Sequence, residues 1–226
     1  MSGILYIVAT PIGNLGDITL RAIETLKAVD IILCEDTRVT KNLLDHFDIK
    51  TPTKSYHQHS TGAKVLEIAS LLEEGKNIAL VTDAGTPGIS DPGNLLVHYL
   101  STPAPEHTST RIVAIPGASA VTAALSVSGF STDKFLFLGF PPHKNKRQKF
   151  FTEVAASEHT VVFYESSHRI KKCLNELAQV LRPDRQVCVC RELTKKFEST
   201  YRGTISEIIN MNISEKGEFV VIISAS

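Results

Sequence analysis

The sequence predicts an α/β protein with two domains, and three observations on its apolar runs support this. First, apolar strand-like runs alternate with amphipathic helix-like stretches in the first half, which favours a parallel sheet with flanking helices. Second, the runs at residues 4–9 and 78–81 are apolar on both faces, as strands covered by helices on both sides must be. Third, after Gly129 strands follow one another with shorter helical insertions, which is typical of a mixed sheet. We therefore predict an N-terminal domain at residues 1–129 and a C-terminal domain at residues 130–226.

A strand is expected at each short apolar run bounded by turn residues, and a helix where apolar residues recur at helical spacing. The first domain then contains, in order, strand 4–9, helix 19–28, strand 30–34, helices 40–47 and 65–73, strand 78–82, helix 92–100, strand 111–115 and helix 118–126. The second contains strands 135–140, 160–164, 186–190, 199–204 and 218–223 and helices 147–156 and 170–181. Residues 51–61 and 101–110 are expected to form loops.

Composition narrows the class of protein. The 226 residues carry 24 Lys and Arg against 24 Asp and Glu, so any contact with nucleic acid must come from a local patch. The apolar runs are far shorter than the ~20 residues of a membrane span. Four cysteines without a secretory segment favour a cytoplasmic protein. Two of them, Cys188 and Cys190, lie in a strand-like run, so we expect a buried strand and no metal site.

Three glycine-containing turns follow strands of the first domain, at residues 10–17, 83–93 and 116–120. Ligands of open α/β sheets bind beyond the carboxyl ends of the strands, where glycine lets the backbone approach them. The acidic pair Glu35 and Asp36 leaves a dinucleotide as one alternative, because an acid at this spacing can bind a ribose. However, neither a G-x-G-x-x-G motif nor a P-loop is present. Loops without phosphate-binding features fit a cofactor with a sulfonium cation better.

Eight short segments between Leu5 and Ile223 carry a resemblance to a known family. They are LYIVATPIGNL (5–15), EDTR (35–38), DAGTPGISDPG (83–93), IPGAS (115–119), FLGFP (137–141), YESSHR (164–169), RELTK (191–195) and KGEFV (216–220). Together they resemble the bacterial 16S ribosomal RNA 2′-O-ribose methyltransferases of the tetrapyrrole methylase superfamily.

The resemblance implies a two-domain tetrapyrrole-methylase-like fold, S-adenosylmethionine as the cofactor, and a homodimer. It also implies methylation of a cytidine ribose in the decoding region, with 16S rRNA or the small ribosomal subunit as the partner and with neither membrane nor DNA involved. Members of this family commonly continue into a small helical domain thought to assist RNA binding, whereas this chain stops at Ser226.

Three sets of site residues follow. By position in the family segments, the residues expected to bind the cofactor are Pro11, Gly85, Thr86, Ile89, Ser119, Ala120, Tyr164, Leu193, Thr194 and Gly217. Ionisable residues after strands of the second domain could act as a general base or stabilise an alkoxide, and the expected catalytic residues are Glu165, Arg169, Glu192 and Lys195. The cations expected to hold RNA phosphates are Lys144, Lys146, Arg147 and Lys149.

Several alternatives stay open at this point. The ionisable residues could form a structural ion-pair cluster, and the cationic run could be a solvated helix start. The scaffold could methylate a tetrapyrrole or another small molecule, since a basic cleft also suits substrates with many carboxylates. The chain could also be a ribosome-binding or RNA-binding factor without catalytic activity.

Overall fold

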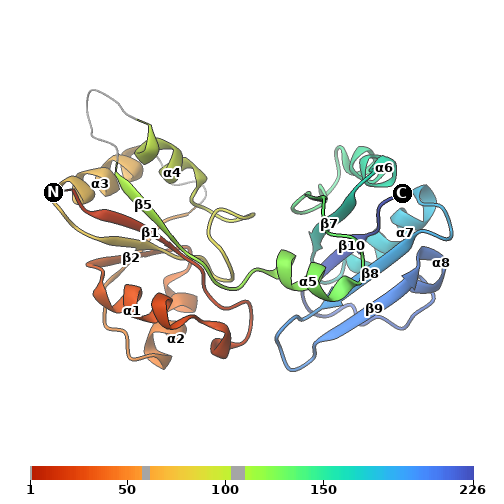
Figure 1. Cartoon of the computed structure of the whole chain (residues 1–226), viewed down its shortest axis with the longest axis horizontal. Helices are drawn as coiled ribbons and strands as arrows, with labels where there is room; N and C mark the ends of the chain where they lie inside the picture. The colour runs from red at the N-terminus through yellow and green to blue at the C-terminus, as the bar shows by residue number, and fades with distance from the viewer. Residues whose placement is uncertain (1, 58–61, 103–109) are drawn as a thin grey trace. The chain divides into compact units, whose positions relative to one another are not determined.

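The computed structural model describes residues 2–57, 62–102 and 110–226, and the chain divides into two compact units (Figure 1). The first unit is Met1–Ser119 and the second is Ala120–Ser226. The division therefore falls before the expected boundary at residues 129 and 130. The reason is that α5 (Ala120–Ser128) packs against β7 (Thr160–Glu165) and β10 (Phe219–Ile223) of the second unit.

The first unit contains a five-stranded parallel sheet with the strand order β3-β2-β4-β1-β5, as the alternating pattern predicts. Its strands are β1 (Ile4–Val8), β2 (Ile31–Cys34), β3 (Thr53–Ser55), β4 (Ile78–Leu80) and β5 (Arg111–Ile115). Its helices are the short η1 (Leu15–Asp17), α1 (Leu20–Ala28), α2 (Thr37–His46), α3 (Gly62–Glu73) and α4 (Asn94–Ser101).

Helices cover both faces of this sheet, with α3 and α4 on one face and α1 and α2 on the other (Figure 1). Successive strand residues point to opposite faces, so Leu33 packs in the cluster with α3 and α4, and Ile32 packs in the cluster with α1 and α2. This explains why the strand runs are apolar on both faces.

The strand β3 was missed, because residues 51–61 are expected to form a loop. Its three residues lack apolar character, and none of their side chains is buried. The strand forms because the backbone of Thr53–Ser55 pairs with β2 at the edge of the sheet. Residues 58–61 of the expected loop, and 103–109 of the other one, lie outside the described residues.

The second unit contains a mixed five-stranded sheet with the order β6-β7-β10-β8-β9, as predicted. Only the pair of β6 (Phe135–Phe137) and β7 is parallel, whereas β10, β8 (Gln186–Arg191) and β9 (Ser199–Thr204) pair antiparallel. Side chains from α6 (Arg147–Ala156), α7 (Ile170–Val180) and α8 (Ile205–Ile208) form one core with this sheet.

The central strand β10 is buried at every position. Cys188 and Cys190 lie buried and unoxidised in the neighbouring β8, as their strand-like run predicts. Within the described residues, no helix is long and apolar enough to cross a membrane.

Candidate functional site

The three glycine loops of the first unit meet at one edge of its sheet. Because β4, β1 and β5 are parallel neighbours, their carboxyl ends deliver residues 83–93, 10–17 and 116–120 to the same side. The loops are also joined directly. Thr10 N donates to Gly85 O at 2.9 Å, Gly85 N donates to Thr10 O at 3.1 Å, and Thr86 Oγ1 donates to Ala118 O at 3.2 Å.

Gly85 is the point where these loops come closest. Its φ of 84° lies in the left-handed region, and a Cβ atom there would lie 3.3 Å from Ile12 Cγ2 and 3.6 Å from Ala118 O. Pro11 is buried beside it, Ser119 is half-buried, and Ile89 is 43% exposed. The structure therefore brings the predicted cofactor residues of the first unit to one edge, except that Ala120 begins α5 in the second unit.

Carboxylates gather at the same edge. The backbone N–H of Asp36 donates to Asp83 Oδ1 at 3.2 Å, which links the ends of β2 and β4. Burial, together with the charges of Glu35 and Asp83, raises the pKa of Asp91 to about 6. Burial and the charge of Asp83 also raise the pKa of Glu35. The local potential is therefore negative, which suits a cofactor with sulfonium and ammonium cations and opposes a pyrophosphate.

The candidate residues of the second unit also meet at one sheet edge. Because β10 runs antiparallel to both of its neighbours, Phe219 at its start pairs with Glu165 at the end of β7 and with Arg191 at the end of β8. Tyr164 lies here as well, with its ring 5.0 Å from that of Phe137 and 5.3 Å from that of Phe140. These rings offer an apolar surface beside the polar groups.

A tight turn after β8 holds Glu192 and Lys195 against the start of β10. Glu192 N donates to Glu218 O and Glu218 N donates to Glu192 Oε1, both at 2.9 Å. Lys195 Nζ lies 3.2 Å from Glu192 Oε1 and 2.8 Å from Glu218 Oε2. Burial raises the pKa of Glu192 and lowers that of Lys195, but these hydrogen bonds and charges outweigh it, so that the pKa of Glu192 lies below and that of Lys195 above the usual range. Both groups are therefore charged at neutral pH.

The same turn contains an unsatisfied polar atom. Thr194 has a φ of 68°, and its Oγ1 is buried with no hydrogen-bond partner among the described residues. A buried hydroxyl in this condition costs free energy unless a ligand pairs with it. Leu193 is buried beside it, and Gly217 packs on Glu192. A ligand with a hydrogen-bonding group could therefore pair with Thr194 Oγ1, as expected for the cofactor.

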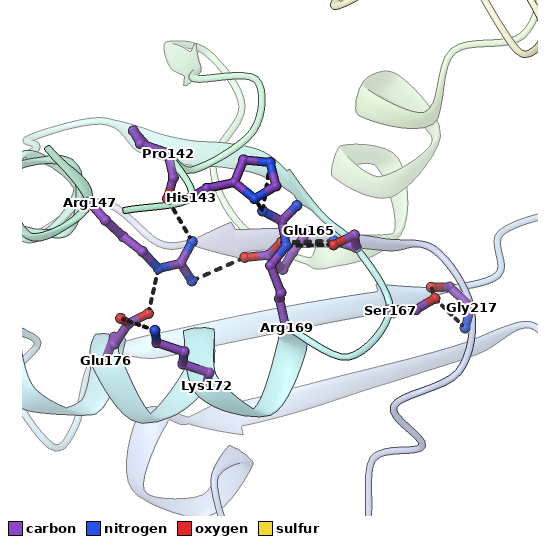
Figure 2. Close-up of polar contacts among 10 residues, drawn as sticks. Pro142, His143, Arg147, Glu165, Ser167, Arg169, Lys172, Glu176 and Gly217 are labelled. Atoms are coloured by element: carbon purple, nitrogen blue, oxygen red, sulfur yellow. Dashed lines mark hydrogen bonds and ion pairs between the residues drawn. The ribbon is translucent and has the colours of Figure 1, made fainter. Parts of the chain in front are cut away.

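Glu165 lies at the centre of a buried ion network (Figure 2). Its Oε2 accepts from Arg147 Nη2 at 3.2 Å, and its Oε1 lies 3.1 Å from Arg169 Nε and 2.8 Å from the backbone N of Ser166. The Glu165 side chain is 0% exposed. Contrary to the prediction, Glu165 is thus not placed to touch a substrate, because both of its oxygens are occupied inside the protein.

Arg147 also needs correction, because it is buried and cannot contact RNA phosphates as predicted. Its Nε donates to Glu176 Oε2 at 2.8 Å, its Nη1 to Pro142 O at 3.2 Å, and its Nη2 to Glu165. The other three cations of the expected set, Lys144, Lys146 and Lys149, are exposed.

Two partners in this region were not predicted. Glu176 lies on α7, where its spacing from Lys172 gave no sign of a buried contact. Ser167 Oγ donates to Gly217 O at 2.5 Å and accepts from Gly217 N at 3.1 Å, so it ties the end of β7 to the glycine turn. Its position in the YESSHR segment was a usable signal.

A parallel sheet with joined glycine loops, followed by a mixed sheet with a polar edge, defines a two-domain α/β protein of the class that binds ligands at the carboxyl ends of its strands. Residues 4–209 match the model of the tetrapyrrole (corrin/porphyrin) methylases, and the chain belongs to this family. The expected enzyme class and cofactor are thereby confirmed: members are methyltransferases that use S-adenosylmethionine.

Similar proteins are named ribosomal RNA small subunit methyltransferase I. That of Synechocystis sp. is 48% identical over 99% of this chain and 80% of its own length. That of Bacillus subtilis is 45% identical over 99% of this chain and 76% of its own length. The methyltransferase CobJ is similar in structure, with a TM-score of 0.72 and 17% identity over 100% of this chain and 95% of its own. Diphthine synthase follows with a TM-score of 0.69 and 14% identity over 99% and 90%. These two likenesses show the fold alone.

Proposed function

We propose that this chain transfers a methyl group from S-adenosylmethionine to the ribose 2′-oxygen of a cytidine in 16S rRNA, in the decoding region of the small subunit. The observation that carries the choice of acceptor is a set of relatives that match 99% of this chain at 43–48% identity and are named as methyltransferases of small-subunit rRNA. The resemblance of the eight sequence segments supports the finer assignment to a cytidine ribose.

The cofactor supplies an electrophilic methyl group on a sulfonium. In the first unit, the joined loops around Gly85 and Thr86 would hold it at a sheet edge with negative potential. In the second unit, Leu193, Gly217 and Thr194 with its unpaired hydroxyl remain the proposed cofactor residues. Transfer is an in-line displacement, so the residues contribute mainly by positioning the two reactants.

Lys195 is the group best suited to assist the chemistry. Its ammonium remains charged, and it is held by Glu192 and Glu218 at a turn where it could stabilise negative charge on the attacking oxygen. Glu192 holds that ammonium in place. Arg169 has a side chain that is 23% exposed and could contact the substrate. The buried Glu165 orients Arg169 through their ion pair.

Lys144, Lys146 and Lys149 would hold rRNA phosphates. They are exposed, and they lie on the segment that follows β6, at the same sheet edge as the catalytic turn. Contacts of this kind place an RNA without reading its sequence.

We further propose a homodimer on the basis of the family resemblance. Sedimentation at several protein concentrations would test it, and a monomer throughout would contradict it.

The decisive experiment incubates the protein with labelled S-adenosylmethionine and small subunits that lack the modification. Label should appear at one ribose of the decoding region and, after alkaline hydrolysis, in a resistant dinucleotide, because a 2′-O-methyl group blocks cleavage of the phosphodiester bond on its 3′ side. Label on a base would contradict the 2′-oxygen assignment. Transfer to a carboxylate-rich tetrapyrrole but not to RNA would favour the small-molecule alternative. Binding of RNA without any transfer would favour a non-catalytic factor.

A further inference from the structure

The strongest unexplained feature of the second unit is the ion network that surrounds Glu165. It places two guanidinium groups and two carboxylates in one cluster, with the side chains of Arg147 and Glu165 only 6% and 0% exposed. Replacing such a cluster by apolar residues is often neutral or stabilising, because burying charges costs free energy that their attraction only partly returns. Stability alone therefore does not account for the network, and a role in positioning is the alternative.

The network contacts both the start and the end of residues 142–147, the segment that carries Lys144 and Lys146. Arg147, the first residue of α6, donates to Pro142 O at 3.2 Å, and Arg169 Nη1 lies 2.9 Å from His143 Nδ1. Both arginines also contact Glu165, so a single carboxylate at the end of β7 fixes the segment's start and finish (Figure 2).

Between these anchors the segment also makes two backbone hydrogen bonds, from Arg147 N to Lys144 O at 3.4 Å and from Phe150 N to Lys146 O at 3.0 Å. Lys146 caps α6 in a left-handed conformation, with a φ of 66° and no side-chain cap hydrogen bond. Such a conformation is strained in a lysine and persists only when the surroundings impose it. Cations at a helix start also oppose the macrodipole. The left-handed φ of Lys146 and the cations at the helix start both raise the free energy of the observed arrangement. The contacts of Arg147 with Pro142 and of Arg169 with His143 offset this.

We propose that Arg147 is a positioning residue, which couples the RNA-contacting lysines to the end of β7 through its three-way contact with Pro142, Glu165 and Glu176. Its planar fork is the reason that an arginine is needed, since Nε, Nη1 and Nη2 each bind a different partner, whereas a lysine has all its donors on one nitrogen. The inference rests on the proposed function, because it assigns Lys144 and Lys146 to RNA. It predicts that Arg147 acts on RNA affinity and leaves methyl transfer itself unchanged.

The test compares Arg147→Met and Arg147→Lys with Arg182→Met, which alters an arginine with a side chain that is 72% exposed in the same unit. Arg147→Met should raise KM for small-subunit RNA about tenfold and leave kcat within about twofold, since only substrate positioning is impaired. Arg147→Lys should rescue little of this, and Arg182→Met should behave as the wild type. A fall in kcat with unchanged KM would overturn the proposal, and so would full rescue by lysine.

Hydrogen exchange provides a readout that does not depend on RNA. Amides of residues 143–146 should exchange faster in Arg147→Met than in the wild type, while those of β10 stay protected. If the wild type fails to methylate RNA, the proposed function is wrong, yet the positioning claim still stands or falls on this measurement. Unchanged exchange at residues 143–146 would overturn it. Should Arg147→Met not fold, Glu176→Gln removes one anchor more gently and should change KM and exchange in the same direction.

Discussion

Gly217 packs so closely on Glu192 that no side chain fits between them. A Cβ atom at Gly217 would lie 2.6 Å from Glu192 Cγ and 2.9 Å from its Oε1, the atom that pairs with Lys195. The φ of Gly217 is also 114°, which glycine alone adopts readily. The Glu192 carboxylate contacts both Lys195 and the N–H of Glu218. Its position therefore depends on the absence of a side chain at Gly217.

Gly217→Ala should displace Glu192 and loosen the turn that carries Lys195. We expect the free energy of unfolding to fall by about 2 kcal/mol and methyl transfer to slow about tenfold or more. Urea unfolding and single-turnover kinetics would measure the two effects. Gly129→Ala is the matched control, because Gly129 also has a positive φ, of 80°, but nothing lies within 4 Å of its would-be Cβ. Equal losses in the two variants would show that backbone strain alone is responsible.

Lys195→Met should remove the cation that could stabilise charge on the attacking oxygen. We expect kcat to fall on the order of 10²-fold with KM for RNA little changed, because this interaction strengthens only in the transition state. Lys195→Arg should recover part of the rate. Lys171→Met is the control, since Lys171 also pairs with a glutamate but its side chain is 61% exposed on α7. An unchanged kcat in Lys195→Met would remove Lys195 from the chemistry.

Gly85→Val should abolish cofactor binding. Its φ of 84° disfavours a β-branched residue, and the added side chain would meet Ile12 and the carbonyl of Ala118 at the junction of the three loops. Calorimetry with S-adenosylhomocysteine would measure the loss. Gly129→Val carries the same backbone strain in open space and should retain affinity. Tight binding by Gly85→Val would place the cofactor elsewhere.

The sequence predicted most of the fold because apolar periodicity reports directly on buried faces. It found β4 and β10, which are apolar on both sides, and it missed β3, whose formation depends on pairing with β2 and not on its own side chains. It also placed α5 in the first domain, since a helix that follows a strand gives no sign of which sheet it will pack against.

In the candidate site, the residues themselves signal the glycine loops of the first unit, and the structure joins these loops at one sheet edge. The loop with Gly85 was singled out by its glycines, whereas Gly217 was taken from the resemblance to the family, and a Cβ atom at either glycine would crowd a neighbour. Arg147 could not be told from its neighbouring lysines, since its burial depends on Glu165 and Glu176, which lie 18 and 29 residues away. The sequence does not distinguish these four cations, whereas in the folded chain Arg147 is buried and the three lysines are exposed.

Asp91→Asn should stabilise the protein at neutral and higher pH. The pKa of Asp91 is about 6 in the folded state against 3.8 for an ordinary aspartate, so the folded protein binds its proton more tightly than the unfolded chain does. The stability that this proton supplies is present below pH 3.8 and is lost as the pH rises through about 6. The variant should therefore gain about 1–2 kcal/mol over the wild type at pH 8, after allowance for solvent screening of a half-buried group, and progressively less towards pH 4.

Urea unfolding of both proteins from pH 4.5 to 8 would measure this difference. Asp48→Asn is the opposite control, because a hydrogen bond and the charge of Lys50 lower the pKa of Asp48, so removing that carboxylate should not stabilise the protein at any pH. A gain for Asp91→Asn that did not vary with pH would mean that the carboxyl is destabilising for reasons other than its charge.

Replacing Lys144, Lys146 and Lys149 together by alanine should weaken rRNA binding and flatten its dependence on salt. Each phosphate that a lysine no longer neutralises lowers the slope of log affinity against log salt concentration by about one unit, so the slope reports how many of the three lysines touch the RNA backbone. The control replaces two exposed lysines of the first unit, Lys27 and Lys50. They lie near the end of α1 and the start of β3, at the edge of the first sheet opposite to its glycine loops. Cofactor affinity should be unchanged in both variants. A parallel fall in cofactor affinity in the triple variant would show that the lysines support the fold of the site, and an unchanged salt slope would place the RNA on another surface.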